Sequence, residues 1–302
     1  MAKPDIQNST LPRPPWLKTR LLYGEDFQRV SSILDHWKLK TVCREAACPN
    51  IGDCFNRQTA TFLILGEVCT RLCSFCNVTK GAPVPPDPSE PQRLACAVQE
   101  LGLRYVVVTS VTRDDLPDGG AAAFARTVHQ VRQTSPAAIV EVLIPDLQGS
   151  IESLRVIVDE GPQVLGHNLE TVPRLYPAVR SRADYGRSLA VLRNAKRVSP
   201  LITKTGIMLG LGESWEEILK TLDDVAGAGC DVVTIGQYLA PTRKHHPIQR
   251  YYAPEEFDEL ARQGTQRGIR WVESGPMVRS SFHAQQQWKN LHGFLCGSSK
   301  LE

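Results

Sequence analysis

Short apolar runs alternate with amphipathic stretches along most of this chain, beginning at Thr61. Runs of this length that are rich in β-branched residues predict buried strands. The predicted strands are 61–65, 105–109, 138–144, 163–168, 203–209, 231–236 and 268–274. Helical spacing of apolar residues between them predicts helices at 91–101, 120–132, 151–158, 185–197, 215–226 and 254–267. Glycine or proline stands at the junctions, as expected of turns.

Strands that alternate with helices predict a parallel sheet in an α/β protein. Six or more such units in one core favour a partial (β/α) barrel of about six parallel strands over two sandwiched domains. The alternative is an open doubly wound sheet, but its G-x-G-x-x-G fingerprint is absent after the first predicted strand. The chemistry of a barrel lies at the C-terminal ends of its strands. We therefore expect the functional site in the loop GEVCTRLCSFC, which follows residues 61–65.

Both ends of the chain lack this alternation. Residues 1 to about 25 are rich in proline and polar residues, and they predict an arm laid over the body. An amphipathic stretch and the first cysteines follow before residue 58. We expect three parts: an N-terminal extension (1–58), the barrel (59–274) and a C-terminal extension (275–302).

Composition sets limits on this interpretation. The chain has 302 residues, of which 42% are hydrophobic, enough for one large core. Its formal net charge of +3 gives no argument for a nucleic-acid partner. No apolar run approaches the roughly 20 residues that span a bilayer, and the N-terminus lacks the apolar region of a secretory signal. We therefore expect a cytoplasmic protein without a membrane partner.

Cysteine usage points to metal chemistry. Six of the nine cysteines lie between residues 43 and 76. Such crowding in a small secreted domain would indicate disulfides, but in a long chain without a signal peptide it favours metal binding or catalysis. The other three, Cys96, Cys230 and Cys296, lie in or beside apolar stretches and are expected to be buried, inert thiols.

Cys69, Cys73 and Cys76 form a C-x3-C-x2-C group directly after the first predicted strand. Three cysteines on one helix face would have the same spacing, but the segment runs into NVTKGAP, which is typical of a turn. Zinc usually takes four ligands in C-x2-C pairs, whereas soft thiolates suit iron–sulfur clusters. Three thiolates would leave one iron of a four-iron cluster free to bind another molecule.

Cys43, Cys48 and Cys54 form a second group with C-x4-C-x5-C spacing. These offsets fit neither helical nor strand periodicity, so packing does not explain them. Pro49 and Asn50 predict a folded-back loop, which would let the three thiolates converge on one cluster. A fourth ligand must then come from elsewhere. The alternatives are a structural zinc site or an inert loop.

The C-x3-C-x2-C group, with Phe75 before its last cysteine, resembles the signature of the radical S-adenosylmethionine superfamily. With both cysteine groups present, the chain resembles the lipoyl synthase family over nearly its whole length. The matching segments are PPWLK, TFLILGEVCTRLCSFCNVTKG, VTSVTRDDLPDGGA, HNLETVPRLYPAVR, KTGIMLGLGE, TIGQYLAPTRKHHPI and GPMVRSSFHA.

This resemblance implies two [4Fe-4S] clusters and S-adenosylmethionine as cofactors. Cys69, Cys73 and Cys76 would hold the cluster that binds S-adenosylmethionine, and Phe75 would lie near its adenine. Cys43, Cys48 and Cys54 would hold the auxiliary cluster. Its fourth ligand, with a catalytic part in releasing sulfur, would be Ser281, the second serine of a family Arg-Ser-Ser-Tyr motif. Phe282 replaces the tyrosine here, so any role of that hydroxyl is lost.

The implied reaction is the radical insertion of two sulfur atoms at carbons six and eight of an octanoyl group, which is carried on a lysine of a lipoyl carrier domain. The auxiliary cluster would donate the sulfur. Implied partners are octanoylated E2 subunits of 2-oxoacid dehydrogenases, the glycine cleavage H protein, an electron donor and an iron–sulfur carrier for cluster repair. Two alternatives stay open: a radical enzyme whose second cluster transfers electrons, and a non-catalytic metal-binding scaffold.

Several polar residues follow predicted strands and are further candidates. Family position suggests cofactor contacts for five of them, and a capped, solvated loop is the alternative for each: Thr109, Arg113, Asp114, Asn168 and Glu170. The same two explanations apply to Ser110, Asp115, Lys204 and Glu213. A basic run, Arg243, Lys244, His245 and His246, predicts a solvated surface or a docking site for an acidic carrier domain.

Overall fold

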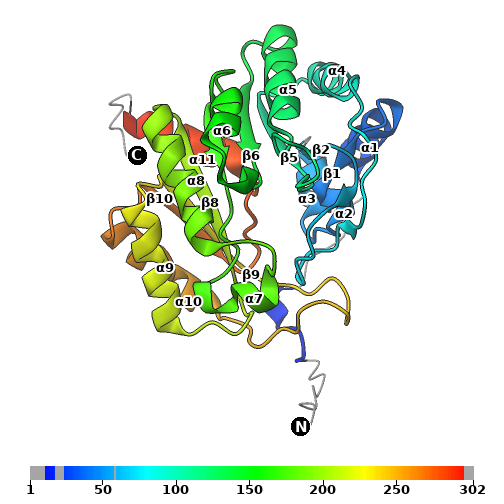
Figure 1. Ribbon diagram of the computed structural model, residues 1–302. Coiled ribbons are helices and arrows are strands. Elements are labelled where there is room, and N and C mark those ends of the chain that lie inside the picture. Colours follow the sequence, from blue (N-terminus) through cyan, green and yellow to red (C-terminus); the bar gives the residue numbers. More distant parts are fainter. Residues whose placement is uncertain (1–10, 18–23, 58, 296–302) are drawn as a thin grey trace.

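The computed structural model describes residues 11–17, 24–57 and 59–295 (Figure 1). Its main sheet has eight strands in the order β1-β2-β5-β6-β7-β8-β9-β10. The strands are β1 (Lys40–Thr41), β2 (Thr61–Ile64), β5 (Tyr105–Ser110), β6 (Ile139–Leu143), β7 (Val164–Gly166), β8 (Ile202–Leu209), β9 (Val232–Gln237) and β10 (Trp271–Gly275). Only the pairing of β1 with β2 is antiparallel. The partial barrel is confirmed, with seven successive parallel strands instead of about six.

The helices that connect these strands lie on the outer side of the curved sheet (Figure 1). They are α4 (Glu90–Leu101), α5 (Ala121–Thr134), α6 (Ile151–Val158), α8 (Tyr185–Val198), α9 (Trp215–Gly227) and α10 (Pro254–Gln266), each within two residues of its predicted bounds. Further helices are η1 (Pro15–Leu17), α1 (Glu25–His36), α2 (Val42–Glu45), α3 (Ile51–Asn56), η2 (Leu147–Gly149), η3 (Pro173–Leu175), α7 (Tyr176–Val179) and α11 (Ala284–Leu295). In the described part of the chain, no helix is long and apolar enough to cross a membrane.

Local sequence explains where these helices begin. Ser150, Asp184 and Ser214 stand at the N-caps of α6, α8 and α9, and each side chain accepts a hydrogen bond from a backbone N–H of the first turn. In α9 the Glu217 carboxylate also accepts from the Ser214 backbone N–H at 2.8 Å, which completes a capping box. An N-cap of this kind contributes about 1 kcal/mol to helix stability.

Side-chain alternation divides each strand between two environments. The outward residues of β2, β5 and β6 join those of α4 and α5 in the main core: Phe62, Val106, Val108, Val140, Val142, Leu94, Val98, Phe124 and Val128. The inward residues Thr61, Leu63, Val107 and Thr109 line a cavity instead. The apolar pattern of the strands therefore fixes the core on the helix side, and it leaves the inner face of the barrel for a site.

The N-terminal end of the barrel is closed by α11, which the sequence analysis did not predict. Trp288 and Leu291 pack against Val164, Ile202 and Val232, the first residues of β7, β8 and β9. Buried polar groups lie on the same floor, where the Lys204 Nζ is 3.1 Å from Glu141 Oε1 and the Tyr105 hydroxyl donates to Glu141 Oε2 at 2.5 Å. Helix α11 thereby covers the N-terminal ends of β7, β8 and β9.

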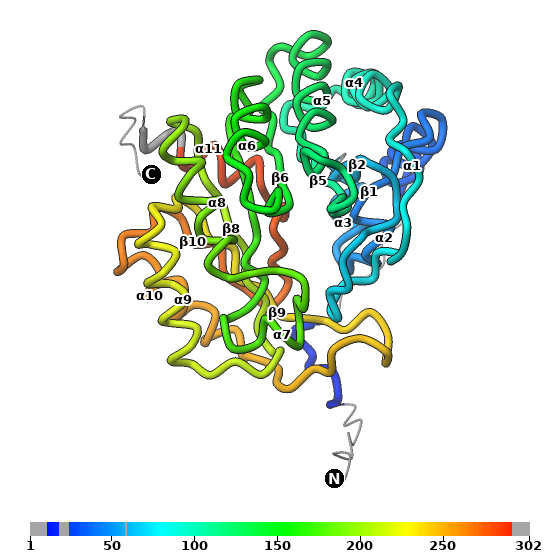
Figure 2. Tube along the Cα trace, in the orientation of Figure 1, coloured from blue at the N-terminus to red at the C-terminus, as the bar shows by residue number. Residues whose placement is uncertain are grey.

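The segment between β10 and α11 crosses the inner side of the barrel, as the path of the orange-to-red trace in Figure 2 indicates. Val278 contacts Gly236 in β9, and Ser281 is hydrogen-bonded to Thr61 in β2. Strand β1 also pairs with β2 although it belongs to the expected N-terminal extension. The division into 1–58, 59–274 and 275–302 therefore stays a proposal.

Replacing Gly236 with alanine tests how closely this crossing segment must approach β9. A β-carbon at Gly236 would lie 2.0 Å from the Val278 carbonyl oxygen. We expect Gly236→Ala to lower the free energy of unfolding in urea by roughly 1–3 kcal/mol. Gly227→Ala in α9 is the control, because a β-carbon there meets nothing within 4 Å, and a neutral or slightly stabilising effect is expected. Equal effects of the two changes would contradict the contact.

Candidate active site

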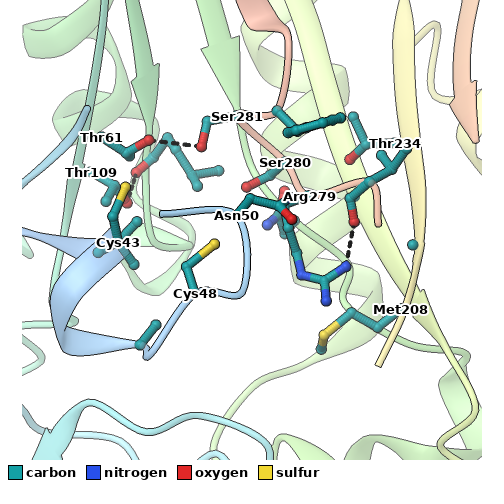
Figure 3. A pocket seen from close by; sticks show the side chains of 18 of the residues that line it. Cys43, Cys48, Asn50, Thr61, Thr109, Met208, Thr234, Arg279, Ser280 and Ser281 are labelled. Carbon is teal, nitrogen blue, oxygen red and sulfur yellow. Dashed lines mark hydrogen bonds between the residues drawn. The ribbon is translucent and has the colours of Figure 1, made fainter. Parts of the chain in front are cut away.

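Both cysteine groups open onto one cavity of about 1010 Å³ inside the barrel. The cysteines on its wall are Cys43, Cys48, Cys54, Cys69, Cys73 and Cys76, and Ser280 and Ser281 lie there with them. Figure 3 shows Cys43 and Cys48 on the N-terminal segment, facing the serines of the C-terminal segment. Segments more than 200 residues apart in the sequence thus meet at one site, as expected of the predicted ligand set.

The first cysteine loop is a chain of tight turns built on α2 and α3. The Cys48 backbone N–H donates to Cys43 O at 3.1 Å, and the Cys54 N–H donates to Asn50 O at 2.9 Å. The buried Asn50 side chain donates from Nδ2 to Met277 O at 2.8 Å. The folded-back loop is confirmed, and Asn50 anchors it to the C-terminal segment.

Ser281 is the serine that faces this loop. Thr61 Oγ1 donates to Ser281 Oγ at 2.7 Å, and Thr61 lies close enough to Cys43 to offset part of the rise in the pKa of that thiol. In Figure 3 the Ser281 hydroxyl is directed at Thr61 on the side of Cys43, whereas Ser280 lies beside Asn50 and Arg279. This arrangement favours Ser281 over Ser280 as the partner of the three cysteines.

The second cysteine loop connects two short strands, β3 (Val68–Cys69) and β4 (Thr79–Lys80), which pair in parallel. Cys73 and Cys76 lie in the turn between them, with the Cys76 N–H donating to Cys73 O at 3.3 Å. The Ser74 N–H donates to Val179 O at 3.0 Å. The segment is therefore a loop, as predicted, and not one face of a helix.

Burial makes the thiolate form of these cysteines costly. Desolvation raises the pKa of Cys43 to about 11, of Cys54 to about 12 and of Cys76 to about 11, and it also raises the pKa of Cys73. A bound cation reverses this preference, because metal ligands are deprotonated thiolates. A donor set of buried, grouped thiols therefore fits soft metal ions such as the irons of a cluster.

Among the described residues, no three His, Cys, Asp or Glu side chains are grouped closely enough to hold one metal ion. The ligands of a four-iron cluster each bind a different iron, so such a cluster does not require this convergence. Two three-cysteine loops on one cavity wall are compatible with that donor geometry.

Unpartnered polar atoms lie on the cavity wall at the ends of β5 and β7 and directly after α7. Ser110 Oγ, His167 Nε2, Asn168 Oδ1 and Arg180 Nε are buried without a hydrogen-bond partner in the described part of the chain, and all four residues line the cavity. Buried polar groups are seldom left unpaired. This wall therefore fits a ligand that carries several hydrogen-bonding groups, as S-adenosylmethionine does in its ribose and amino-acid parts.

Two sequence comparisons identify the family. The radical SAM superfamily model matches residues 63–225, and the model of the N-terminal domain of lipoyl synthase matches residues 3–48. Lipoyl synthase of Rubrobacter xylanophilus is 52% identical over 287 residues, which cover 95% of this chain and 89% of that protein. The chain belongs to the lipoyl synthase family. Lipoyl synthase of Caldanaerobacter subterraneus is also 52% identical, over 91% of this chain and 96% of its own length.

A solved structure supports the fold of this lipoyl synthase family member. Methylornithine synthase superposes with a TM-score of 0.53 at 15% sequence identity, and the match covers 83% of this chain and 72% of that chain. The two proteins therefore share the partial barrel. A similarity at this level supports the fold and no conclusion about activity.

The residues predicted to contact the cofactor divide into two sets. Phe75, Thr109, Asn168 and Glu170 line the cavity. Phe75 packs on Val172, Leu175 and their apolar neighbours. Thr109 Oγ1 donates to Leu143 O at 2.8 Å, and Asn168 Nδ2 donates to Glu170 Oε1 at 3.1 Å. Burial raises the pKa of the Glu170 carboxyl.

Arg113 and Asp114 do not line the cavity, and their expected contact with the cofactor stays a prediction. The Arg113 guanidinium is buried and paired with Asp115 at 2.8 Å, and its Nη1 donates to Leu65 O. Asp114 accepts two hydrogen bonds from Arg71 in the second cysteine loop. Both side chains hold the polypeptide around the site, and the distant partners Leu65 and Arg71 were not predictable from spacing.

Other candidates also have structural partners. Lys204 pairs with Glu141, and Glu213 accepts from the backbone N–H groups of Gly210 and Leu211 at 2.6 and 2.9 Å. Arg243 and Lys244 are exposed, so a docking role for the basic run stays a prediction. Of the three isolated cysteines, Cys230 is buried and Cys96 is half-buried, while Cys296 lies outside the described residues.

His167 is a site residue that the sequence analysis missed. Its Nδ1 is 2.9 Å from Ile144 O, and because a carbonyl only accepts, Nδ1 carries the hydrogen and Nε2 presents a lone pair. Burial lowers the pKa of His167 to about 4. The motif HNLET, in which a histidine follows a predicted strand end directly, was the available signal.

Stability should depend on pH through His167. The unfolded state takes up a proton near pH 6.5, whereas the folded state does so only near pH 4. The free energy of unfolding should therefore fall as pH drops from 6.5 to 4, by up to about 3 kcal/mol. Urea titrations at pH 5 and pH 7 should show a smaller difference for His167→Gln than for the parent. An unchanged difference would mean that His167 does not titrate as its burial indicates.

Proposed function

We propose that this protein forms the lipoyl group by inserting two sulfur atoms at carbons six and eight of an octanoyl chain carried on a protein lysine. The observation that carries the proposal is that both three-cysteine loops and Ser281 line the same inner cavity. Membership of the lipoyl synthase family supports the same activity. The substrate is accordingly an octanoylated carrier protein.

The proposal assigns each loop a different cluster. Cys69, Cys73 and Cys76 hold the [4Fe-4S] cluster that binds S-adenosylmethionine, and the auxiliary [4Fe-4S] cluster is held by Cys43, Cys48, Cys54 and Ser281. When bound, the first pair of cofactors supplies the radical that removes hydrogen from a saturated carbon, and the auxiliary cluster supplies sulfur. The support for this assignment is the sequence of each loop and its separate place on the cavity wall.

The protein contributes orientation and exclusion of water. Leu63, Val107, Leu143 and Met208 give the cavity an apolar lining between the two loops, which suits a saturated acyl chain. A radical intermediate needs such shielding from solvent and from side reactions. The polar atoms of Ser110 and Asn168 at the strand ends would orient S-adenosylmethionine.

The identity of the partners is part of this proposal. Octanoylated E2 subunits of 2-oxoacid dehydrogenases and the glycine cleavage H protein are the proposed carriers, with an electron donor and an iron–sulfur carrier as further partners. Arg243 and Lys244 are exposed, and they lie in the same loop as Pro241 and Ile248, which line the cavity. A carrier domain that delivers its octanoyl group to the cavity would meet this loop.

The two cysteine loops should fail differently when one ligand is removed. Cys73→Ala should abolish 5′-deoxyadenosine formation, because the cluster that delivers the electron is lost. Cys48→Ala should leave deoxyadenosine formation measurable while the lipoyl product disappears. The assay is anaerobic iron–sulfur reconstitution followed by mass analysis of an octanoyl-lysine peptide.

Cys230→Ala is the matched control, since that buried cysteine lies outside the cavity lining, and both products should persist. Equal loss of deoxyadenosine in the Cys73 and Cys48 variants, with both still folded, would contradict the division of labour. Deoxyadenosine without any lipoyl product in the parent would instead favour a radical enzyme with an electron-transfer cluster.

Ser281 should matter for sulfur release more than for radical formation. A serine oxygen is a harder ligand than thiolate and a poorer match for iron, so it is a weak point from which an iron can leave. Ser281→Cys should hold the auxiliary cluster yet insert sulfur at least tenfold more slowly, while deoxyadenosine formation persists. Ser281→Ala should assemble this cluster poorly.

Ser280→Ala is the control for Ser281, because the neighbouring hydroxyl lies beside Arg279 and away from Cys43 (Figure 3). It should form lipoyl product at a rate close to that of the parent. Parent-like product formation by Ser281→Ala, or an inactive Ser280→Ala, would identify the wrong serine as the ligand.

A further inference from the structure

The second cysteine loop carries an arginine whose side chain does not face the cavity. Arg71 lies between Cys69 and Cys73, and it is only 5% exposed. Its Nε and Nη2 donate to both carboxylate oxygens of Asp114, each at 2.8 Å. Its Nη1 and Nη2 donate to the two oxygens of Asp146 at 3.0 and 2.6 Å. One planar guanidinium thus makes two double contacts, a geometry that only arginine offers.

The two carboxylates belong to different strand ends. Asp114 follows β5, and Asp146 follows β6, where its side chain is fully buried. Asp146 Oδ2 also accepts from Nε of Arg187 in α8 at 2.8 Å. We call these four residues, Arg71, Asp114, Asp146 and Arg187, the Arg71 clamp. It connects the middle of the cysteine loop to two neighbouring strands and to a helix.

The charges of the Arg71 clamp balance, with two arginines against two aspartates. Burial raises the pKa of the Cys73 thiol and outweighs the Arg71 charge, which lowers it, so we infer the effect of the clamp on the loop from position. Because Asp146 is buried, it must keep its partners: a buried carboxylate without a partner is strongly destabilising. The clamp therefore holds the loop in one arrangement.

The other hydrogen bonds of the second cysteine loop reach elements other than β6. Thr70 bonds to Thr112 on the β5 side, with its N–H donating to Thr112 O at 3.1 Å. Ser74 bonds to Ala178 and Val179, beyond β7. Among the described contacts of residues 70–76, those of Arg71 alone reach the end of β6.

We propose that Arg71 is a positioning residue, which sets the direction of the Cys69 and Cys73 thiols by fixing the loop between them to the ends of β5 and β6. This inference rests on the proposed function, in which those cysteines hold the cluster that binds S-adenosylmethionine. A displacement of about 1 Å in such a site can lower the rate about 100-fold.

Arg71→Lys tests the proposal, because lysine keeps the charge but cannot form the double contacts. Full-length protein is reconstituted anaerobically, and bound iron, the electron paramagnetic resonance of the reduced cluster and deoxyadenosine formation are measured. We expect a 10- to 100-fold lower rate of deoxyadenosine formation and a weaker spectral response to S-adenosylmethionine. Arg174→Lys is the matched control, since it removes an exposed double contact with Glu217 and should leave every reading unchanged.

A second measurement does not depend on the cluster. In iron-free full-length protein, alkylation of Cys69 and Cys73 by iodoacetamide should be several-fold faster in Arg71→Lys than in the parent, with Cys43 unaffected. Parent-like alkylation of Cys69 and Cys73 would overturn the proposal, as would a parent-like spectral response in the reconstituted variant. A parent without deoxyadenosine formation would instead overturn the proposed function, and the alkylation result would still decide the role of Arg71.

Asp114→Asn covers the case in which Arg71→Lys does not fold. It weakens one double contact, keeps the shape of the side chain and leaves Asp146 paired. A folded Asp114→Asn with faster alkylation of Cys69 and Cys73 supports the positioning role. A folded Asp114→Asn that matches the parent in alkylation and in deoxyadenosine formation overturns it.

Discussion

The segment from Gly275 to Ala284 bridges an open barrel, and the site depends on that bridge. It begins on β10, contacts Gly236 of β9 through Val278, and reaches β2 through the hydrogen bond between Thr61 and Ser281. Its end delivers Ala284 to Tyr105 and Val107 of β5. The first and last strands of the sheet do not pair with each other, so this chain segment supplies the connection across the inside.

Two consequences follow from this bridge. It brings Ser281 to the first cysteine loop, and it places α11 over the N-terminal end of the barrel. The hydrogen bond from Asn50 to Met277 O also ties the first cysteine loop to the C-terminal segment. A ligand set drawn from both ends of the chain is thereby assembled only when the barrel is folded.

Local pattern predicted those features that depend on local physics. The longer strands and helices between Thr61 and Gln266 follow from apolar periodicity, whereas the short β3, β4, η2, η3 and α7 were not predicted. The cysteine loops follow from their spacing and from the turn residues beside them. Helix α11 has the spacing Ala284, Gln287, Trp288, Leu291. Gln287, which is polar, interrupts the apolar pattern of this helix. The helix is buried because it packs against the N-terminal ends of the strands, and the periodicity of one segment does not reveal such a contact.

Partners across the fold could not be predicted from one sequence. Arg71 meets Asp114 and Asp146 over separations of 43 and 75 residues, and nothing in either segment indicates which basic side chain an aspartate will pair with. Asp114 was expected from family position to contact the cofactor, and the structure adds a partner that spacing did not reveal: its carboxylate holds the loop that carries Cys69 and Cys73. The orientation of His167 likewise depends on a carbonyl of the neighbouring strand end, 23 residues away.

The separation of the two cysteine loops is set by β2 and by what is attached to its ends. Thr61 at the start of the strand donates to Ser281 and lies near Cys43, and the second loop begins a few residues after Ile64. Four strand residues span roughly 10 Å, and β5 fixes this strand by parallel pairing. The Arg71 clamp then holds the second loop against β5 and β6, while Asn50 holds the first against the C-terminal segment. The second loop is thus held by the ends of β5 and β6 and the first by the crossing C-terminal segment, so an acyl chain bound in the cavity would lie between two separately held loops.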